Sequence, residues 1–290
     1  MAAIANLSKA SCAQCGSLTS SRITGTICIL RHGETGMNSR GFIVGSIDDP
    51  LTGWGVQQAV ITALNFKNRK ISFDAIFSSP LSRAVTTATI IAKMQDQKKQ
   101  PVLDKRLRER CVGELEGQPV FPKMLERFIG EETPALGSES LSSFNGRVIE
   151  FLNEINPLIN TLIVCHGLTL LAMLCKIKGW GFKKLLKYGV PGNCEPIIFG
   201  IAEPCQCGSK FYELREKKVV VLHAQPPSKL VAKLILSVCF ILFFGSWGLL
   251  LLPERYLPIA VPAILMIGIP SMFGMGYAVN ELNPNDGGIM

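Results

Sequence analysis

Ile29-Leu30-Arg31-His32-Gly33-Glu34-Thr35 and its distant counterpart Val164-Cys165-His166-Gly167 are the two stretches from which the fold can be predicted. Each is an apolar run that ends in histidine followed by glycine. A short apolar run of this kind is typical of a strand that is buried on both faces. Because ligands of open α/β sheets bind beyond the carboxyl ends of the strands, we expect both imidazoles, and a functional site, at that edge.

The chain between these stretches alternates between strand-like and helix-like segments. Residues 26–30 predict the first strand, and Thr52 is a plausible N-cap for a helix with apolar residues at helical spacing. Residues 73–77 predict a second strand, and residues 78–83 form its corner with the next helix. This places Arg83 in the first turn of that helix, beside His32, where a guanidinium can fork onto phosphate oxygens. A surface arginine is the alternative reading of the same segment.

The rest of the first 222 residues continues the alternation. A charged loop at residues 107–110 follows a short apolar stretch, and we expect two helices at residues 119–128 and 140–155. Residues 161–165 predict the strand that carries His166, residues 168–177 a helix, and residues 196–201 and 211–222 two closing strands. The predicted class is α/β: a three-layer sandwich with a mostly parallel sheet and helices on both faces.

Five motifs in this order resemble the histidine phosphatase, or phosphoglycerate mutase-like, superfamily over about residues 26–222. They are Arg31-His32-Gly33-Glu34-Thr35 with Asn38, Pro50-Leu51-Thr52, Ser78-Ser79-Pro80 with Arg83, Leu107-Arg108-Glu109, and His166-Gly167. The resemblance implies a metal-independent phosphatase that forms a phosphohistidine on His32. It also implies that Glu109 is the proton donor and that His166 assists catalysis, where a protonated ring would help to hold the phosphoryl group. The phosphoryl group would be held by Arg31, Asn38, Arg83 and Gly167, and neither a cofactor nor a catalytic metal is implied. Glu114 and Glu116 lie close to Glu109 in the sequence. Of these three residues, Glu109 is the one whose spacing matches the family pattern.

Two departures from the family pattern bear on the substrate. Phe42 and Val44 stand where many relatives carry polar residues, so this wall of the pocket is expected to be less polar. The segment from Glu109 to His166 is also shorter than in cofactor-dependent mutases, which favours a phosphatase over a mutase. The expected substrate is a phosphorylated small molecule or a phosphoprotein, and not a nucleic acid. The alternatives are mutase-type phosphoryl transfer and a catalytically silent scaffold of the same fold.

The C-terminal part has a different composition. The chain has a mean hydropathy of +0.30 and a formal net charge of +8. After Lys229, two basic residues stand against three acidic ones, so the tail carries −1 and the first 229 residues carry +9. Residues 230–252 and 259–279 are each long enough to cross a bilayer, and the short connector between them predicts a hairpin. Lysines before the first run predict that the catalytic domain faces the cytoplasm, with an organelle membrane among the candidates.

We therefore expect an N-terminal arm or transit segment at residues 1–25, a catalytic domain at 26–224 and a membrane hairpin at 225–290. Ten cysteines without a signal-peptide core predict a reducing compartment rather than a disulfide framework. Cys12-x-x-Cys15 and Cys205-x-Cys207 offer four soft metal ligands. Because the first pair falls in the expected mobile arm and the second pair is tightly spaced, no metal site is predicted.

Overall fold

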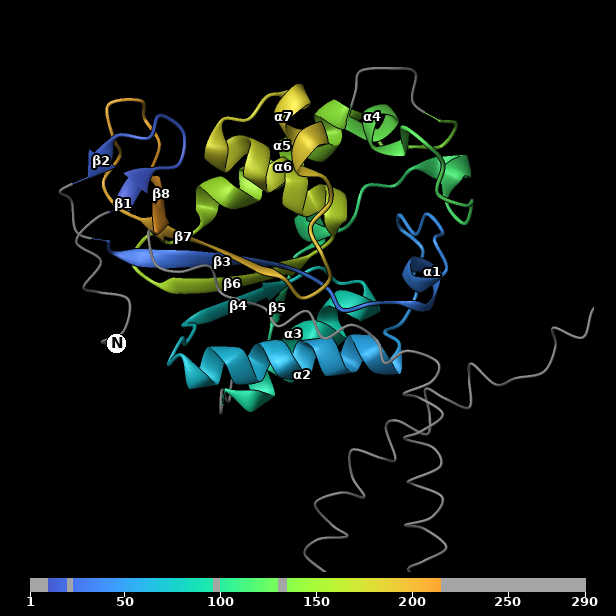
Figure 1. Cartoon of the computed structure of the whole chain (residues 1–290), viewed down its shortest axis with the longest axis horizontal. Coiled ribbons are helices and arrows are strands. Elements are labelled where there is room, and N and C mark those ends of the chain that lie inside the picture. The colour runs from blue at the N-terminus through green and yellow to red at the C-terminus, as the bar shows by residue number, and fades with distance from the viewer. Residues whose placement is uncertain (1–9, 20–22, 96–99, 130–134, 215–290) are drawn as a thin grey trace, which may run out of the picture. The chain divides into compact units, whose positions relative to one another are not determined.

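The computed structural model describes residues 10–19, 23–95, 100–129 and 135–214 of the chain (Figure 1). The chain divides into two compact units, residues 1–222 and 223–290. The second unit lies outside the described residues, and so do both predicted membrane spans, residues 230–252 and 259–279. Among the helices in the described ranges, none is long and apolar enough to cross a membrane.

Eight strands form one sheet in the order β2-β1-β8-β7-β3-β6-β4-β5. Their bounds are β1 Ala10–Cys12, β2 Leu18–Thr19, β3 Gly25–Arg31, β4 Ala75–Ser78, β5 Val102–Leu103, β6 Asn160–Cys165, β7 Pro196–Ile201 and β8 Phe211–Leu214. The prediction of a mostly parallel sheet holds only for β3, β6, β4 and β5, which pair in parallel. The other half is antiparallel: β7 pairs with β3 and with β8, and β1 pairs with β8 and with β2.

Helices cover both faces of the sheet, so the predicted α/β sandwich is confirmed (Figure 1). Helices α2 and α3 lie on one face, and α5, α6 and α7 lie on the other. The helix bounds are α1 Gly36–Ser39, α2 Gly53–Asn68, α3 Ser82–Met94, α4 Met124–Ile129, α5 Leu141–Glu154, α6 Gly167–Lys178 and α7 Phe182–Tyr188, with 3-10 helices at Lys105–Leu107 and Gly113–Leu115.

Strand β3 is the centre of the hydrophobic core. Ile27 and Ile29 point into the cluster that includes the buried residues of α5 and α6, while Cys28 and Leu30 point into the cluster under α2 and α3. All four side chains are fully buried. This alternation follows from the two-residue period of a strand and explains why the run before His32 is apolar at every position from Ile27 to Leu30.

Several element bounds differ from the predicted ones by one or two residues, and two predictions need a larger correction. The helix expected at residues 119–128 begins only at Met124, because Lys123 adopts a left-handed backbone conformation with φ of 62°. The N-terminal arm expected at residues 1–25 also needs correction, since Ala10–Cys12 pairs with β8 and Leu18–Thr19 pairs with β1. A free edge of β8 is thereby covered by residues from the start of the chain.

Gly33 and Gly55 bring the loop after β3 into direct contact with the start of α2. A Cβ atom at Gly55 would lie 2.1 Å from the Glu34 carbonyl oxygen, and one at Gly33 would lie 2.4 Å from the Gly55 carbonyl oxygen. The amide of Gly33 donates to Thr87 Oγ1 at 3.1 Å, so it is not directed at an anion. Gly33 is needed for the close approach of two backbone segments.

Replacing Gly55 with alanine is therefore expected to lower the free energy of unfolding by about 1–3 kcal/mol, the usual cost of overpacking. Gly146 is a matched control, because it also lies within a helix and a Cβ atom there would contact nothing within 4 Å. Gly146→Ala should instead add about 0.5–1 kcal/mol through helix propensity. Urea unfolding of both variants measures the difference, and equal stabilities would contradict the proposed backbone contact.

Candidate active site

The two predicted histidines meet at the carboxyl edge of neighbouring parallel strands. In the register of β3 and β6, Arg31 lies opposite Cys165, so His32 and His166 both follow the last paired residues. The His32 amide donates to the Cys165 carbonyl at 3.0 Å, which extends the ladder by one bond. The two imidazole centroids lie 5.1 Å apart, with an angle of 60° between the ring planes. The expectation that one sheet edge would bring both rings together is confirmed.

Arg83 connects the two histidines. Its Nε lies 3.2 Å from His32 Nε2 and 3.2 Å from His166 Nδ1. Its two terminal nitrogens donate to the backbone carbonyls of Ile47 at 2.6 Å and Gly45 at 2.8 Å. The side chain is 1% exposed and belongs to the first turn of α3, so it is not the surface arginine of the alternative reading. Because each terminal nitrogen carries two hydrogens, the guanidinium keeps donors for a ligand.

The environment of His32 favours a neutral ring. Its Nδ1 lies 2.7 Å from the Gly33 carbonyl oxygen, which can only accept, so Nδ1 carries the proton and Nε2 carries the lone pair. Burial lowers the pKa of His32 well below its usual value, and the charges of Arg31 and Arg83 lower it further. The result is an unprotonated Nε2 in a buried, cationic surrounding, which is the form needed for nucleophilic attack.

His166 lies deeper than His32 and is fully buried. Its Nε2 lies 2.7 Å from the Ser79 hydroxyl, while Nδ1 faces the Arg83 donor. Burial lowers the pKa of His166 well below its usual value, with Arg83 as the largest charge contribution. The sequence interpretation allowed a protonated His166 that holds phosphate; in the free protein its ring is instead neutral and sits behind Arg83.

Glu109 reaches the same edge from the loop after the 3-10 helix Lys105–Leu107. Its carboxylate accepts hydrogen bonds from the backbone amides of Leu168 at 3.0 Å and Thr169 at 3.2 Å, in the first turn of α6. A Cβ atom at Gly167 would lie 3.7 Å from Glu109 Oε2 and 2.8 Å from Val190. The missing side chain at Gly167 therefore keeps this corner open.

The nearby acidic residues lie elsewhere. Glu116 accepts hydrogen bonds from Ser46 and from the Val112 amide, and Glu114 lines a separate surface depression. Among the three acidic candidates considered from the sequence, Glu109 is the one that lines the central cavity.

A cavity of about 310 Å³ opens over His32, Arg83 and Glu109. Arg31 and Asn38 also line it. Among the described residues, Arg31 Nε and Asn38 Oδ1 are buried polar atoms without a hydrogen-bond partner. Because buried polar groups are normally paired, these two atoms mark a place for a polar ligand. Six of the seven predicted site residues line the cavity, and only His166 does not.

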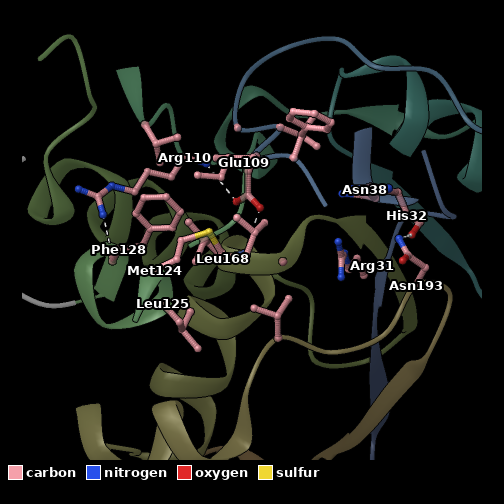
Figure 2. Close-up of a pocket in the computed structure, with 18 of the residues that line it drawn as sticks. Arg31, His32, Asn38, Glu109, Arg110, Met124, Leu125, Phe128, Leu168 and Asn193 are labelled. Carbon is pink, nitrogen blue, oxygen red and sulfur yellow. Dashed lines mark hydrogen bonds between the residues drawn. The ribbon is translucent and has the colours of Figure 1, made fainter. Parts of the chain in front are cut away.

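The cavity wall away from the histidines is mostly apolar. Figure 2 shows Met124, Leu125 and Phe128 grouped on the side opposite His32, Asn38 and Asn193. Phe42 and Val44 line the wall as the sequence suggested, together with Val112, Val120, Leu168 and Val190. The site can thus hold a small anion at one end and an apolar group at the other.

Two contributors were not identified as site residues from the sequence. Asn193 donates to the His32 carbonyl at 2.8 Å (Figure 2), and the Ser79 hydroxyl positions His166. Ser79 belongs to a motif that was quoted for the resemblance, so a signal for it existed. Asn193 lies in a loop before β7 with no motif of its own, and only the tertiary structure brings it to β3.

Comparison with known proteins agrees with the family resemblance described from the sequence. Residues 27–206 match the profile of the histidine phosphatase superfamily (branch 1). The chain is 36% identical over 169 residues to "Putative phosphoserine phosphatase 2" of Hydrogenobacter thermophilus, covering 54% of this chain and 80% of that protein. It is 30% identical to a 2,3-bisphosphoglycerate-dependent phosphoglycerate mutase of Rhizobium etli, covering 61% of this chain and 91% of that protein.

Among solved structures, the chain is similar to a mutant phosphoserine phosphatase of Entamoeba histolytica in complex with phosphoserine. The TM-score is 0.54 and the sequence identity 25%, and the match covers 68% of this chain and 99% of that one.

The charge of Arg31 offers a test of the electrostatics of His32. Arg31→Gln removes a nearby positive charge, so protonation of the imidazole becomes less unfavourable and the pKa of His32 should rise. Arg31→Lys keeps the charge and should leave that pKa near the wild-type value. NMR titration of the imidazole in the free protein measures both effects. If the pKa of His32 were unchanged in Arg31→Gln, the charge of Arg31 would not contribute to that pKa.

Proposed function

Because this chain belongs to the histidine phosphatase superfamily, we propose that it is a phosphohydrolase that removes a phosphoryl group from a phosphomonoester through a phosphohistidine on His32. The observation that carries the proposal is the state of His32: a buried, unprotonated Nε2 beside Arg83, at the end of a cavity lined by an unpartnered Arg31 Nε. Members of this superfamily transfer or hydrolyse phosphoryl groups by means of a histidine.

The first step is binding of the phosphoryl group. Arg31 offers its unpartnered Nε, Arg83 its remaining guanidinium hydrogens, and Asn38 its amide. Charge-assisted hydrogen bonds from guanidinium groups suit the equatorial oxygens of a phosphoryl group in transfer. His166 acts behind them as a positioning residue, since its ring holds Arg83 and is itself held by Ser79.

The chemical steps follow from the positions of His32 and Glu109. His32 Nε2 forms a bond to phosphorus while the bond from phosphorus to the ester oxygen breaks, and Glu109 gives that oxygen a proton. Glu109 then takes a proton from water, the resulting hydroxide attacks phosphorus, and the bond to Nε2 breaks to release phosphate. Support for Glu109 as the acid and base comes from its place on the cavity wall and its anchoring by the first turn of α6.

The form of the cavity favours hydrolysis over mutase-type transfer. A mutase acting on a bisphosphorylated acid needs a second anion-binding group. Arg110 is the remaining arginine on the cavity wall. Its Nε donates to the Glu139 carbonyl and one terminal nitrogen donates to the Phe128 carbonyl, which leaves fewer of its donors for a second anion. The neighbouring wall is apolar. We therefore propose a monoester whose leaving group is largely apolar.

The phosphohistidine step makes a direct prediction for the full-length chain. A small phosphodonor should label the wild type with acid-labile, alkali-stable phosphate, and His32→Ala should lose both the label and the release of inorganic phosphate. Turnover that survives His32→Ala would contradict the mechanism. Absence of labelling and turnover with every donor would instead favour a catalytically silent scaffold of the same fold.

Glu109→Gln provides the matched control for this experiment. With a donor such as p-nitrophenyl phosphate, whose leaving group needs no proton, His32 should still become labelled. Water would then be activated poorly, so turnover should fall by about 10²- to 10⁴-fold while the label persists. Adding 2,3-bisphosphoglycerate and a monophosphoglycerate tests the mutase alternative, because a mutase would return the phosphoryl group to the acid instead of releasing it.

We further propose that residues 225–290 attach the catalytic domain to a membrane as a hairpin, with that domain and the C-terminus in the cytoplasm. The support is the sequence alone: two largely apolar runs of spanning length, with Lys217, Lys218 and Lys229 before the first run and Lys233 near its start. Neither run lies within the described residues.

Truncation tests this attachment. A chain that ends at Gln225 should stay in the supernatant after a carbonate wash of membranes, whereas the full-length chain should sediment with them. If the truncated chain sediments equally, the hairpin is not the attachment. Protease treatment of intact organelles checks the orientation, since a domain facing the cytoplasm should be digested.

A further inference from the structure

Four cysteines from opposite ends of the catalytic unit converge at one corner of the sheet. Cys12 and Cys15 belong to β1 and the turn after it, and Cys205 and Cys207 belong to the loop between β7 and β8. All four sulfur atoms lie within 4.8 Å of one another. Individual Sγ distances are 2.8 Å between Cys205 and Cys207, 3.3 Å between Cys12 and Cys205, 3.5 Å between Cys12 and Cys207, and 3.8 Å between Cys15 and Cys205. All four are free thiols.

The two loops that carry these thiols are built alike. In each loop the second cysteine is followed by a glycine in the left-handed region, Gly16 with φ of 75° and Gly208 with φ of 83°. Each of these glycine amides donates to the carbonyl of the first cysteine, Gly16 to Cys12 at 2.9 Å and Gly208 to Cys205 at 2.8 Å. The repeated turn directs two sulfurs from each loop toward a common point.

This arrangement matches the demands of zinc. Tetrahedral Zn²⁺ with thiolate ligands has Zn–S bonds of about 2.3 Å, which separates the sulfurs by about 3.8 Å. The Sγ–Sγ distances, of which the shortest is 2.8 Å and none exceeds 4.8 Å, span a range that includes this spacing. Four cysteine ligands leave no open position, and closed sites of this type serve structure rather than catalysis.

The place of the cluster supports a structural role. Gly25, the first residue of β3, pairs with Ile201, and the cluster follows that end of β7, whereas His32 follows the other end of β3. The hydrophobic cluster at this corner is small, with Ala10, Cys12, Ala202 and Tyr212 as its buried members. A small core of this kind gains stability from a bound metal.

We propose that Cys12, Cys15, Cys205 and Cys207 bind one structural Zn²⁺, which fastens the N-terminal strands β1 and β2 to the β7–β8 hairpin. Binding replaces four thiol protons with one metal ion, so the four protons are released to solvent. The sequence argument against a metal fails at its first premise, because residues 10–19 belong to the sheet and are not a free arm.

The test is the metal content of the full-length chain. Elemental analysis of protein purified from zinc-supplemented cells should find about one zinc per chain, as expected for a closed tetrathiolate site. Cys15→Ser and Cys207→Ser remove exposed ligands and should lose the zinc. Cys111→Ser is the matched control, because Cys111 is also accessible and its thiol instead faces the Gly137 carbonyl at 3.5 Å. The control should keep the zinc.

Cobalt substitution of the wild-type chain is a second test, which does not depend on the folding of a ligand variant. Co²⁺ should give the visible bands of a tetrahedral ion and near-ultraviolet thiolate charge-transfer bands, and added Zn²⁺ should remove both. Protein without zinc and without this spectrum would overturn the proposal. So would zinc retained in both ligand variants, or a disulfide between any two of the four cysteines found by mass spectrometry.

Discussion

The active site depends on one shared contact, the Nε of Arg83 between His32 Nε2 and His166 Nδ1, at 3.2 Å from each. A buried guanidinium is tolerated only where its donors are satisfied, and here the carbonyls of Gly45 and Ile47 accept from it. In return, its charge helps to keep both imidazoles neutral. If Arg83 moved, the two rings would lose their common partner and one of the charges that add to the effect of burial in lowering their pKa values.

The surrounding fold is arranged so that these three side chains cannot shift independently. His32 and His166 end adjacent parallel strands joined by continuous backbone pairing, and both faces of β3 are covered by helices. Arg83 lies in the first turn of α3, and Thr87 of the same helix accepts from the Gly33 amide. The Gly33–Gly55 contact then fixes α2 against the same loop. The strands that hold His32 and His166 pair with each other, and the helix that holds Arg83 contacts the loop after His32. None of the three side chains is therefore held by an isolated element.

The cysteine cluster lies near the opposite end of β3. There the strands are short and the buried apolar cluster is small, so packing alone contributes less. The two cysteine loops meet at that corner, so the proposed zinc site lies at the end of β3 opposite to His32. The two ends of one strand would accordingly differ in chemistry: cations and imidazoles at the carboxyl end, thiolates near the amino end.

Much of this protein could be predicted from the sequence, because its strongest signals are local. Apolar runs before His32 and His166 determine two buried strands, and the Ser-Ser-Pro corner places Arg83 in the first turn of a helix. Tertiary structure alone decided which residues beyond these motifs reach the site. Asn193 depends on a loop whose course is set by packing against distant elements. The same holds for Cys12 and Cys205, separated by 193 residues, since a pairing of β1 with β8 leaves no periodic trace in either segment.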